Sequence, residues 1–243
     1  MAHKPHDHSH DHGHHHHDHD HEHDHHGHDH HHYGHDHHHH GHDHHHHHHG
    51  DDHHHHWESA DYVRGWLARD AGRQGERAPI VARLIAAVPF ARDAAIEVLD
   101  VGGGAGAISE AVLEAFPNAA VTVQDFSPHM LAAARERLLR HSARLHTVLS
   151  DLADPAWIKI AGGPFDLAVS GIAIHNLHEM AAIAACYDGV RSLLKNGGAF
   201  IDYDHFDRVG GVPLHQHMLK VAGFASADVL WHEHPTAVIK ASV

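Results

Sequence analysis

The residues best suited to chemistry lie in a glycine-rich turn and the acidic residues that follow it. The segment VLDVGGGAG contains Gly102, Gly104 and Gly106. Glycine lets the backbone turn sharply and lets a ligand approach the peptide groups closely. Asp125 follows about 20 residues later at the end of an apolar run, where a carboxylate can accept two hydrogen bonds from a ribose diol. Asp151, in the segment VLSDL, could reach an adenine amino group. This spacing predicts a nucleotide-like ligand.

The glycine-rich turn alone does not distinguish a nicotinamide-dependent enzyme from other nucleotide-binding enzymes. Residues 102–107 also satisfy the dinucleotide pattern G-x-G-x-x-A, which is typical of nicotinamide-dependent enzymes. A dehydrogenase of this kind usually needs a second domain or a longer substrate region, and we expect none after residue 243. We therefore expect a nucleotide-binding enzyme of another kind.

Histidine dominates the N-terminal segment. Residues 1–56 contain 34 of the 44 histidines, interspersed with eleven acidic residues. Neutral imidazole is a good ligand for Ni, Zn, Co and Cu ions, and neighbouring carboxylates can orient it. An expression tag would be one uniform run, whereas this segment is interrupted by Asp, Gly and Tyr33. Its composition looks like that of the His-rich extensions of bacterial nickel and zinc handling proteins.

We expect the segment to bind divalent transition-metal ions as a whole, with no defined site. Its histidine runs consist of His14, His15, His16, His17, His37, His38, His39, His40, His44, His45, His46, His47, His48, His49, His53, His54, His55 and His56.

Composition divides the chain near residue 56. The segment 1–56 has almost no apolar residues and cannot bury enough surface to offset its ordering entropy, so we expect a tail that is disordered without metal. Residues 57–243 are long and apolar enough for one core. The formal net charge of −15, without a basic stripe, argues against a nucleic-acid partner. No apolar run reaches the roughly 18 residues that a membrane span needs. The single cysteine, Cys186, is expected to be a small buried residue and fits a reducing cytoplasm.

Strands and helices alternate along residues 57–243. The apolar pattern predicts strands at 96–101, 121–125, 145–149, 165–170, 199–203, 226–231 and 236–242, and helices at 57–71, 79–88, 107–116, 128–139, 179–194 and 214–222. This alternation predicts an α/β fold with a mostly parallel, doubly wound sheet and helices on both faces. The last two strands are joined by about four residues, so the last strand must be antiparallel, because a parallel pair needs a longer crossover.

Five segments resemble, in order and spacing, the motifs of class I S-adenosylmethionine-dependent methyltransferases. They are VLDVGGGAG, VTVQDFSPHMLAAARERL, VLSDL, FDLAVSGIAIHNL and LLKNGGAFI. The resemblance covers residues 57–243 and implies a Rossmann-like sheet of seven strands. It also implies that S-adenosylmethionine is the cofactor and that a small molecule accepts the methyl group.

The resemblance assigns cofactor contacts residue by residue. The glycines of the turn would face the methionine part, Asp125 the ribose, and Asp151 the adenine, while Asp100 would act through the cofactor amino group. The remaining contacts that it implies are Phe126 and Leu152 beside the adenine, and Ser170 and Gly171 at the transfer site.

Histidines near the ends of the fourth and fifth strands are candidates for a base. His175 is the first candidate, followed by Asp204 and His205; alternatively, His175 and His178 only anchor the following helix. A second group near the C-terminus, His215, His217, His232 and His234, is expected to be solvated at the surface and not to bind metal.

The segment after the fifth strand departs from the family's pattern. Many small-molecule relatives insert a helical lid there, whereas residues 202–206 run almost directly into the helix expected from 214. The pocket is then open, completed by a partner chain in a homodimer, or covered by the N-terminal segment. The resemblance separately implies that the leading helices, including Tyr62 and Trp66, cover the site. Two functions remain open: a methyltransferase with a metal-binding tail, or a metal-homeostasis protein whose cofactor-binding domain is a scaffold without turnover.

Overall fold

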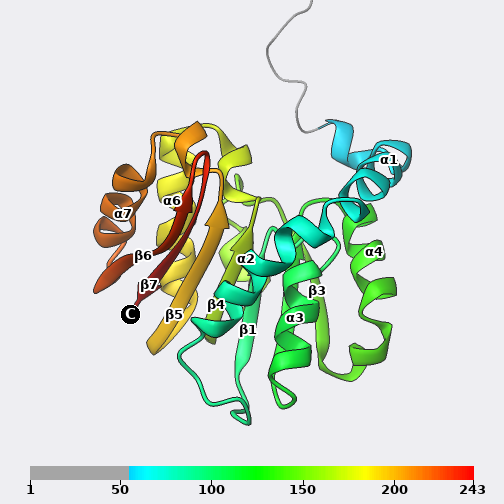
Figure 1. The fold of residues 1–243 in the computed structure, drawn as a ribbon, viewed down its shortest axis with the longest axis horizontal. Coiled ribbons are helices and arrows are strands. Elements are labelled where there is room, and N and C mark those ends of the chain that lie inside the picture. Colours follow the sequence, from blue (N-terminus) through cyan, green and yellow to red (C-terminus); the bar gives the residue numbers. More distant parts are fainter. Residues whose placement is uncertain (1–54) are drawn as a thin grey trace, which may run out of the picture. The chain divides into compact units, whose positions relative to one another are not determined.

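The computed structural model describes residues 55–243, which form one α/β unit (Figure 1). The expected tail, up to His54, lies outside the described residues. The unit is built on a seven-stranded sheet with the order β3-β2-β1-β4-β5-β7-β6. Its strands are β1 (Glu97–Val101), β2 (Ala120–Asp125), β3 (Leu145–Leu149), β4 (Phe165–Gly171), β5 (Leu194–Asp204), β6 (Ser226–Glu233) and β7 (Thr236–Ser242).

Five strands are parallel and the C-terminal pair is not. The pairs β3–β2, β2–β1, β1–β4 and β4–β5 are parallel, whereas β7 is antiparallel to both β5 and β6. This arrangement confirms the predicted fold class. The parallel strands are apolar along nearly their whole length because helices cover the sheet on both faces.

Helices α2 (Gln74–Ala86), α3 (Ala107–Ala115) and α4 (Pro128–Arg137) pack on one face of the sheet, and α5 (Trp157–Ala161), α6 (Met180–Leu193) and α7 (Val212–Val221) on the other (Figure 1). Side chains of neighbouring strand residues therefore belong to different hydrophobic cores: Phe200 to the core that contains α6, and Ile201 to the core that contains α2 and α3. Cys186 of α6 is a buried free thiol, as predicted. No helix within residues 55–243 is long and apolar enough to span a membrane.

The N-terminal helix is divided, which the sequence pattern did not predict. A 3-10 turn, η1 (His55–Glu58), is followed by α1 (Ala60–Ala71). Ser59 separates them because its extended backbone and side chain cap α1, with Oγ accepting a hydrogen bond from the Tyr62 amide at 3.4 Å. Similarly, α2 begins before Pro79, at which its start was expected; Arg77 in this added turn is ion-paired with Asp70.

Two further elements differ from the prediction. Helix α5 was missed because five residues are too few to show helical periodicity. Strand β5 begins at Leu194, five residues earlier than expected, and its pairing with β4 shifts register between Phe165 and Leu167. Gly197, with φ of +76°, lies in this irregular part.

Candidate functional site

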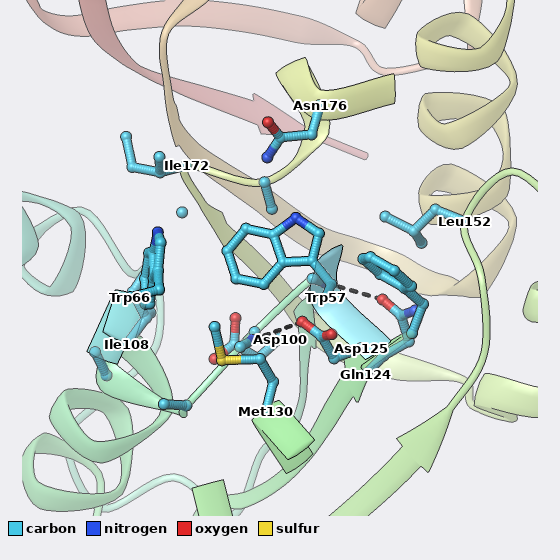
Figure 2. Close-up of a pocket in the computed structure, with 18 of the residues that line it drawn as sticks. Trp57, Trp66, Asp100, Ile108, Gln124, Asp125, Met130, Leu152, Ile172 and Asn176 are labelled. Carbon is cyan, nitrogen blue, oxygen red and sulfur yellow. Dashed lines mark hydrogen bonds between the residues drawn. The ribbon is translucent and has the colours of Figure 1, made fainter. Parts of the chain in front are cut away.

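A cavity of about 330 Å³ lies at the carboxyl ends of β1, β2 and β4 (Figure 2). The chain passes from β1 to β2 and β3 on one side and to β4 on the other. In open α/β sheets, ligands bind at such a reversal of strand order. The volume is also in the range of small-molecule sites. The cavity is therefore the first candidate for a functional site.

The glycine-rich turn forms the floor of the cavity. Gly102, Gly104 and Gly106 all have φ between +54° and +76°. A Cβ on Gly102 would lie 2.6 Å from the Cβ of Ala173, so only glycine lets the turn pack against the loop after β4. Gly102 and Gly104 line the cavity, whereas Gly106 lies outside it as the N-cap of α3.

Asp125 connects this turn to α4. Its Oδ2 accepts a hydrogen bond from the Gly104 amide at 2.9 Å, and its Oδ1 accepts one from the Ser127 amide at 2.8 Å. Burial raises the pKa of Asp125, and these backbone hydrogen bonds oppose the shift. The Phe126 amide also donates to this carboxylate, whose remaining acceptor capacity is available to a ligand hydroxyl.

Asp100 is buried beneath the turn with one oxygen unsatisfied. Its Oδ2 accepts hydrogen bonds from the Ser109 amide at 3.2 Å and the Ser109 hydroxyl at 2.5 Å. Its Oδ1 has no hydrogen-bond partner, although the residue is only 1% exposed and lines the cavity. Burial raises the pKa of Asp100 to about 7. An unsatisfied buried acceptor facing a cavity indicates a ligand that donates a hydrogen bond there.

Gln124 is a site residue that sequence reasoning missed. Its Oε1 accepts a hydrogen bond from the Gly102 amide at 2.9 Å, and its Nε2 donates one to the Ser150 carbonyl at 2.6 Å. The side chain thus joins the ends of β1, β2 and β3 beside the cavity (Figure 2). A polar residue inside the apolar run VTVQD was the available signal.

Aromatic side chains of η1 and α1 form another wall. Trp57, Tyr62 and Trp66 line the cavity, and the Trp57 ring lies 5.2 Å from that of Tyr62 and 5.4 Å from that of Trp66. The Ser127 hydroxyl donates a hydrogen bond to the Trp57 carbonyl at 2.6 Å. Residues of η1 and α1 thus form part of the cavity wall.

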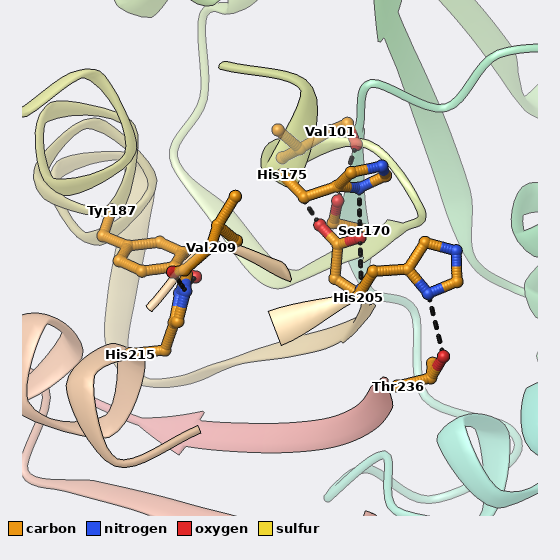
Figure 3. Close-up of polar contacts among 9 residues, drawn as sticks. Val101, Ser170, His175, Tyr187, His205, Val209, His215 and Thr236 are labelled. Atoms are coloured by element: carbon orange, nitrogen blue, oxygen red, sulfur yellow. Dashed lines mark hydrogen bonds and ion pairs between the residues drawn. The ribbon is translucent and has the colours of Figure 1, made fainter. Parts of the chain in front are cut away.

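Most of the other predicted cofactor residues line the cavity, but one does not. Phe126, Asp151, Leu152 and Gly171 line the cavity with those already described. Ser170 does not: it is fully buried, and its hydroxyl donates a hydrogen bond to the Val101 carbonyl at 3.0 Å, which ties β4 to β1 (Figure 3).

The three predicted catalytic residues contact one another: the rings of His175 and His205 lie 5.1 Å apart (Figure 3), and both residues bond Asp204. Asp204 accepts hydrogen bonds from His175 Nδ1 at 2.5 Å, from the His175 amide at 2.9 Å and from the His205 amide at 2.8 Å. The His205 ring bonds Thr236 Oγ1 at 2.8 Å. None of the three candidates is among the residues that line the cavity.

The loop held by Asp204 does line the cavity. It includes η3 (Ile174–Leu177), and Ala173, Asn176 and His178 lie in the wall. Ile172 and His178 have φ of +55° and +57° and are the non-glycine residues with positive φ in the described part of the chain. Such conformations cost free energy and persist only where surrounding contacts enforce them. The geometry thus favours the anchoring alternative for His175.

The C-terminal histidines do not form one solvated group. His215 is 1% exposed, so the prediction of a surface position is wrong for this residue. Its Nε2–H donates to the Val209 carbonyl at 2.8 Å, and its Nδ1 accepts a hydrogen bond from the Tyr187 hydroxyl at 2.7 Å (Figure 3). These partners compensate its burial, which lowers its pKa. His232 and His234 both bond Asp207. Between residues 55 and 243, no cluster of three or more His, Cys, Asp or Glu could hold a metal ion.

Comparison with known proteins finds a family match for part of the chain. Residues 99–200 match a family described as a methyltransferase domain. A malonyl-[acyl-carrier protein] O-methyltransferase of Geobacter sulfurreducens is 38% identical over 103 residues, which is 42% of this chain and 36% of the relative. A release factor glutamine methyltransferase of Chlorobaculum tepidum is 39% identical over 75 residues, 30% of this chain and 26% of the relative. The matches thus span about a third of these curated relatives or less.

Solved methyltransferase structures share the fold. An O-methyltransferase family protein of Burkholderia thailandensis superposes with a TM-score of 0.61 at 17% identity, over 75% of this chain and 59% of the other. Human N-acetylserotonin methyltransferase in complex with SAM gives a TM-score of 0.58 at 16% identity, over 76% and 57%.

Proposed function

We propose that this chain transfers a methyl group from S-adenosylmethionine to a small-molecule acceptor. One observation carries the proposal: Asp100, whose buried Oδ1 has no hydrogen-bond partner, lines a cavity together with the glycine turn and with Asp125 at the end of the next strand. A cofactor with an amino group and a ribose diol would satisfy both carboxylates. The methyltransferase-domain match over residues 99–200 supports the same conclusion.

The chain's residues fit the parts of this cofactor. Asp125 would accept the ribose hydroxyls, Asp100 Oδ1 would accept the amino group, and the glycine turn would face the methionine chain. Phe126, Leu152 and Asp151 would hold the adenine. When bound, the cofactor supplies an electrophilic methyl group and its own leaving group, so the protein's main task is to align the acceptor and exclude water. The wall of Trp57 and Trp66 serves that exclusion.

His175 and Asp204 would affect this site by holding the loop at residues 172–178 in position. Asp204 fixes the backbone and ring of His175, and thereby the strained loop that closes the cavity between Gly102 and Asn176. A base that takes a proton from a substrate must come within hydrogen-bond reach of it. The His175 Nδ1 atom bonds Asp204, the His205 Nδ1 atom bonds Thr236, and neither residue lines the cavity.

The N-terminal tail would add metal binding to this activity. The repeated histidines and carboxylates of residues 1–56 support binding of Ni, Zn, Co or Cu ions. The alternative function, a metal-homeostasis protein without turnover, rested on the absent lid insertion. Residues of η1 and α1 line the cavity, which weakens that support.

Turnover decides between these two functions. The full chain is incubated with S-adenosylmethionine and a panel of amine, hydroxyl and carboxyl acceptors, and S-adenosylhomocysteine is measured by chromatography. We expect product with at least one acceptor class and at least tenfold less with Asp125→Ala. If the chain binds the cofactor but forms no product above the variant, the result contradicts the enzyme and supports the scaffold.

A further inference from the structure

The buried residue Ser127 joins three parts of the cavity wall without lining the cavity itself. Its hydroxyl donates a hydrogen bond to the Trp57 carbonyl at 2.6 Å and accepts one from the Met130 amide at 3.3 Å. The Ser127 amide donates to Asp125 Oδ1 at 2.8 Å. Trp57, Met130 and Asp125 all line the cavity (Figure 2). One residue thus connects the acidic end of β2, the first turn of α4 and η1.

These bonds give Ser127 a role beyond that of a helix cap. As the N-cap of α4 it needs only an acceptor for the Met130 amide, which an Asp carboxylate would also supply. A hydroxyl has one hydrogen to donate, and here the Trp57 carbonyl, 70 residues away in the sequence, receives it. Because Ser127 is fully buried, water does not compete for this hydrogen. The hydroxyl is therefore a link between η1 and the end of β2.

The N-terminal side of the cavity is an aromatic wall, formed by Trp57, Tyr62 and Trp66, that buries little surface. Trp57 contacts the other two rings, and His56 stacks on Tyr62 with 5.2 Å between the ring centroids. The three wall residues are half-buried, and helix α1, which is described over its whole length, buries one side chain, Val63. Elements with so little buried surface open at low free-energy cost. The position of the aromatic wall therefore depends strongly on the contacts at Trp57.

We infer that Ser127 is a positioning residue that couples cofactor binding at Asp125 to closure of the aromatic wall. The inference rests on the proposed function and adds to it a residue that does not line the cavity. A ribose on Asp125 would hold the carboxylate and, through its hydrogen bond, the Ser127 amide. The Ser127 hydroxyl then holds the Trp57 carbonyl, while the bound ligand covers the half-buried Trp57 side chain. Coupling of this kind is reciprocal, so loss of the Ser127 contact with the wall should also weaken cofactor binding.

Two serines at helix N-caps provide a matched pair of substitutions. Ser59 caps α1 and Ser127 caps α4 with nearly the same extended backbone, φ and ψ being −86° and 121° in the first and −90° and 115° in the second. Glycine is tolerated at N-caps at small cost, so Ser59→Gly and Ser127→Gly each remove a capping hydroxyl from a helix that should persist. Of the two, Ser127→Gly alone removes the bond to the Trp57 carbonyl.

Amide hydrogen exchange over residues 57–66 of the full chain measures the coupling, with and without saturating S-adenosylhomocysteine and with a chelator present to remove metal ions. We expect the ligand to slow this exchange roughly tenfold or more in the parent and in Ser59→Gly, and less than about twofold in Ser127→Gly. Ser127→Gly should also bind S-adenosylhomocysteine roughly tenfold more weakly. Ser127→Thr, which keeps the hydroxyl, should restore the parental result in both measurements.

Several results would overturn the inference. Equal slowing in the parent and in Ser127→Gly is one, and absence of slowing in a parent that binds S-adenosylhomocysteine is another. A Ser127→Thr variant that unfolds in urea like the parent but exchanges like Ser127→Gly is the third, because the hydroxyl would then not form the link. Calorimetry separates these results from failure of the proposed function: if S-adenosylhomocysteine does not bind the parent, the proposed function fails and this inference fails with it.

Discussion

At the scale of single residues, the two buried aspartates with unsatisfied oxygens differ in what surrounds them. Asp100 faces the cavity and can be satisfied by a ligand. Asp202, on β5, faces the packed core between β4 and α6, and neither of its oxygens has a hydrogen-bond partner. The hydroxyls of Tyr187 and Ser170 lie near it, but they donate to His215 and Val101 instead. Asp100 is thus suited to binding, whereas Asp202 affects stability.

Cofactor binding should depend on pH through Asp100. Its pKa is about 7 because of burial, so below that pH the group is protonated and no longer attracts an ammonium. We expect affinity for S-adenosylmethionine to fall roughly tenfold for each pH unit well below 7, from the linkage of one proton. Calorimetry between pH 5.5 and 7.5 measures this, and Asp100→Asn should flatten the profile. A profile that stays steep in the variant assigns the proton to another group.

Stability should also depend on pH, through Asp202. Burial and the nearby Asp204 carboxylate raise its pKa well above 3.8. Because the folded pKa is the higher one, the protonated form favours folding, and this contribution is lost as pH rises above 3.8. Asp202→Asn should therefore be more stable than the parent at pH 8, by about 1–3 kcal/mol, and gain less at pH 5. Urea unfolding at both pH values checks this; a variant that is less stable at pH 8 contradicts it.

At the scale of elements, the strands and helices that build the site were largely predictable and the loops were not. Nearly continuous burial at residues 98–101 and 121–123, most of them Val or Leu, is typical of parallel strands covered on both faces. The contact of Ser127 with Trp57 spans 70 residues, and nothing in local periodicity predicts it. The same holds for Asp204 and His175: their types suggested chemistry, but only their mutual distance shows that they hold a loop.

Loss of the Asp204–His175 contact should free the loop at residues 172–178 and weaken cofactor binding. Asp204→Asn keeps the side-chain size but removes the charge that holds the His175 amide and ring. Charge-assisted hydrogen bonds of this kind contribute about 1.5–3 kcal/mol. We expect roughly tenfold weaker binding of S-adenosylhomocysteine, together with faster amide hydrogen exchange over residues 172–178.

His205→Asn is the matched control for the loop. Its ring hydrogen-bonds Thr236 and only packs edge-on against the His175 ring, whose centroid lies 5.1 Å away, so the variant should leave cofactor affinity and exchange over residues 172–178 within about twofold of the parent. Equal effects of the two substitutions would show that the whole end of β5, and not the Asp204–His175 pair, supports the loop.

At the scale of the whole molecule, the chain has two parts of different composition, residues 1–56 and residues 57–243, and each part needs its own test. The α/β unit was predictable because its motifs keep their order along residues 57–243. The histidine segment is predictable only as a composition, since a repeat of His and Asp specifies ligand types without geometry.

Metal binding by the segment should be lost on acidification. Imidazole must be neutral to bind a metal ion, and its unperturbed pKa is about 6.5. Equilibrium dialysis of the full chain against Zn²⁺ should show several bound ions at pH 7.5 and few at pH 5.5. Binding of one ion or none at pH 7.5 contradicts the metal-binding tail. Unchanged binding at pH 5.5 would assign the ligands to carboxylates.

The most direct test of the account is a calorimetric titration of the full chain, with a chelator present, against S-adenosylmethionine and separately against NAD. We expect S-adenosylmethionine to bind with a Kd on the order of micromolar, Asp125→Ala to weaken that binding at least tenfold, and NAD not to bind. Asp188→Ala, on the exposed side of α6, should behave like the parent. If the folded chain does not bind S-adenosylmethionine, or binds NAD in its place, the cavity is not a methyl-donor site and the central claim is contradicted.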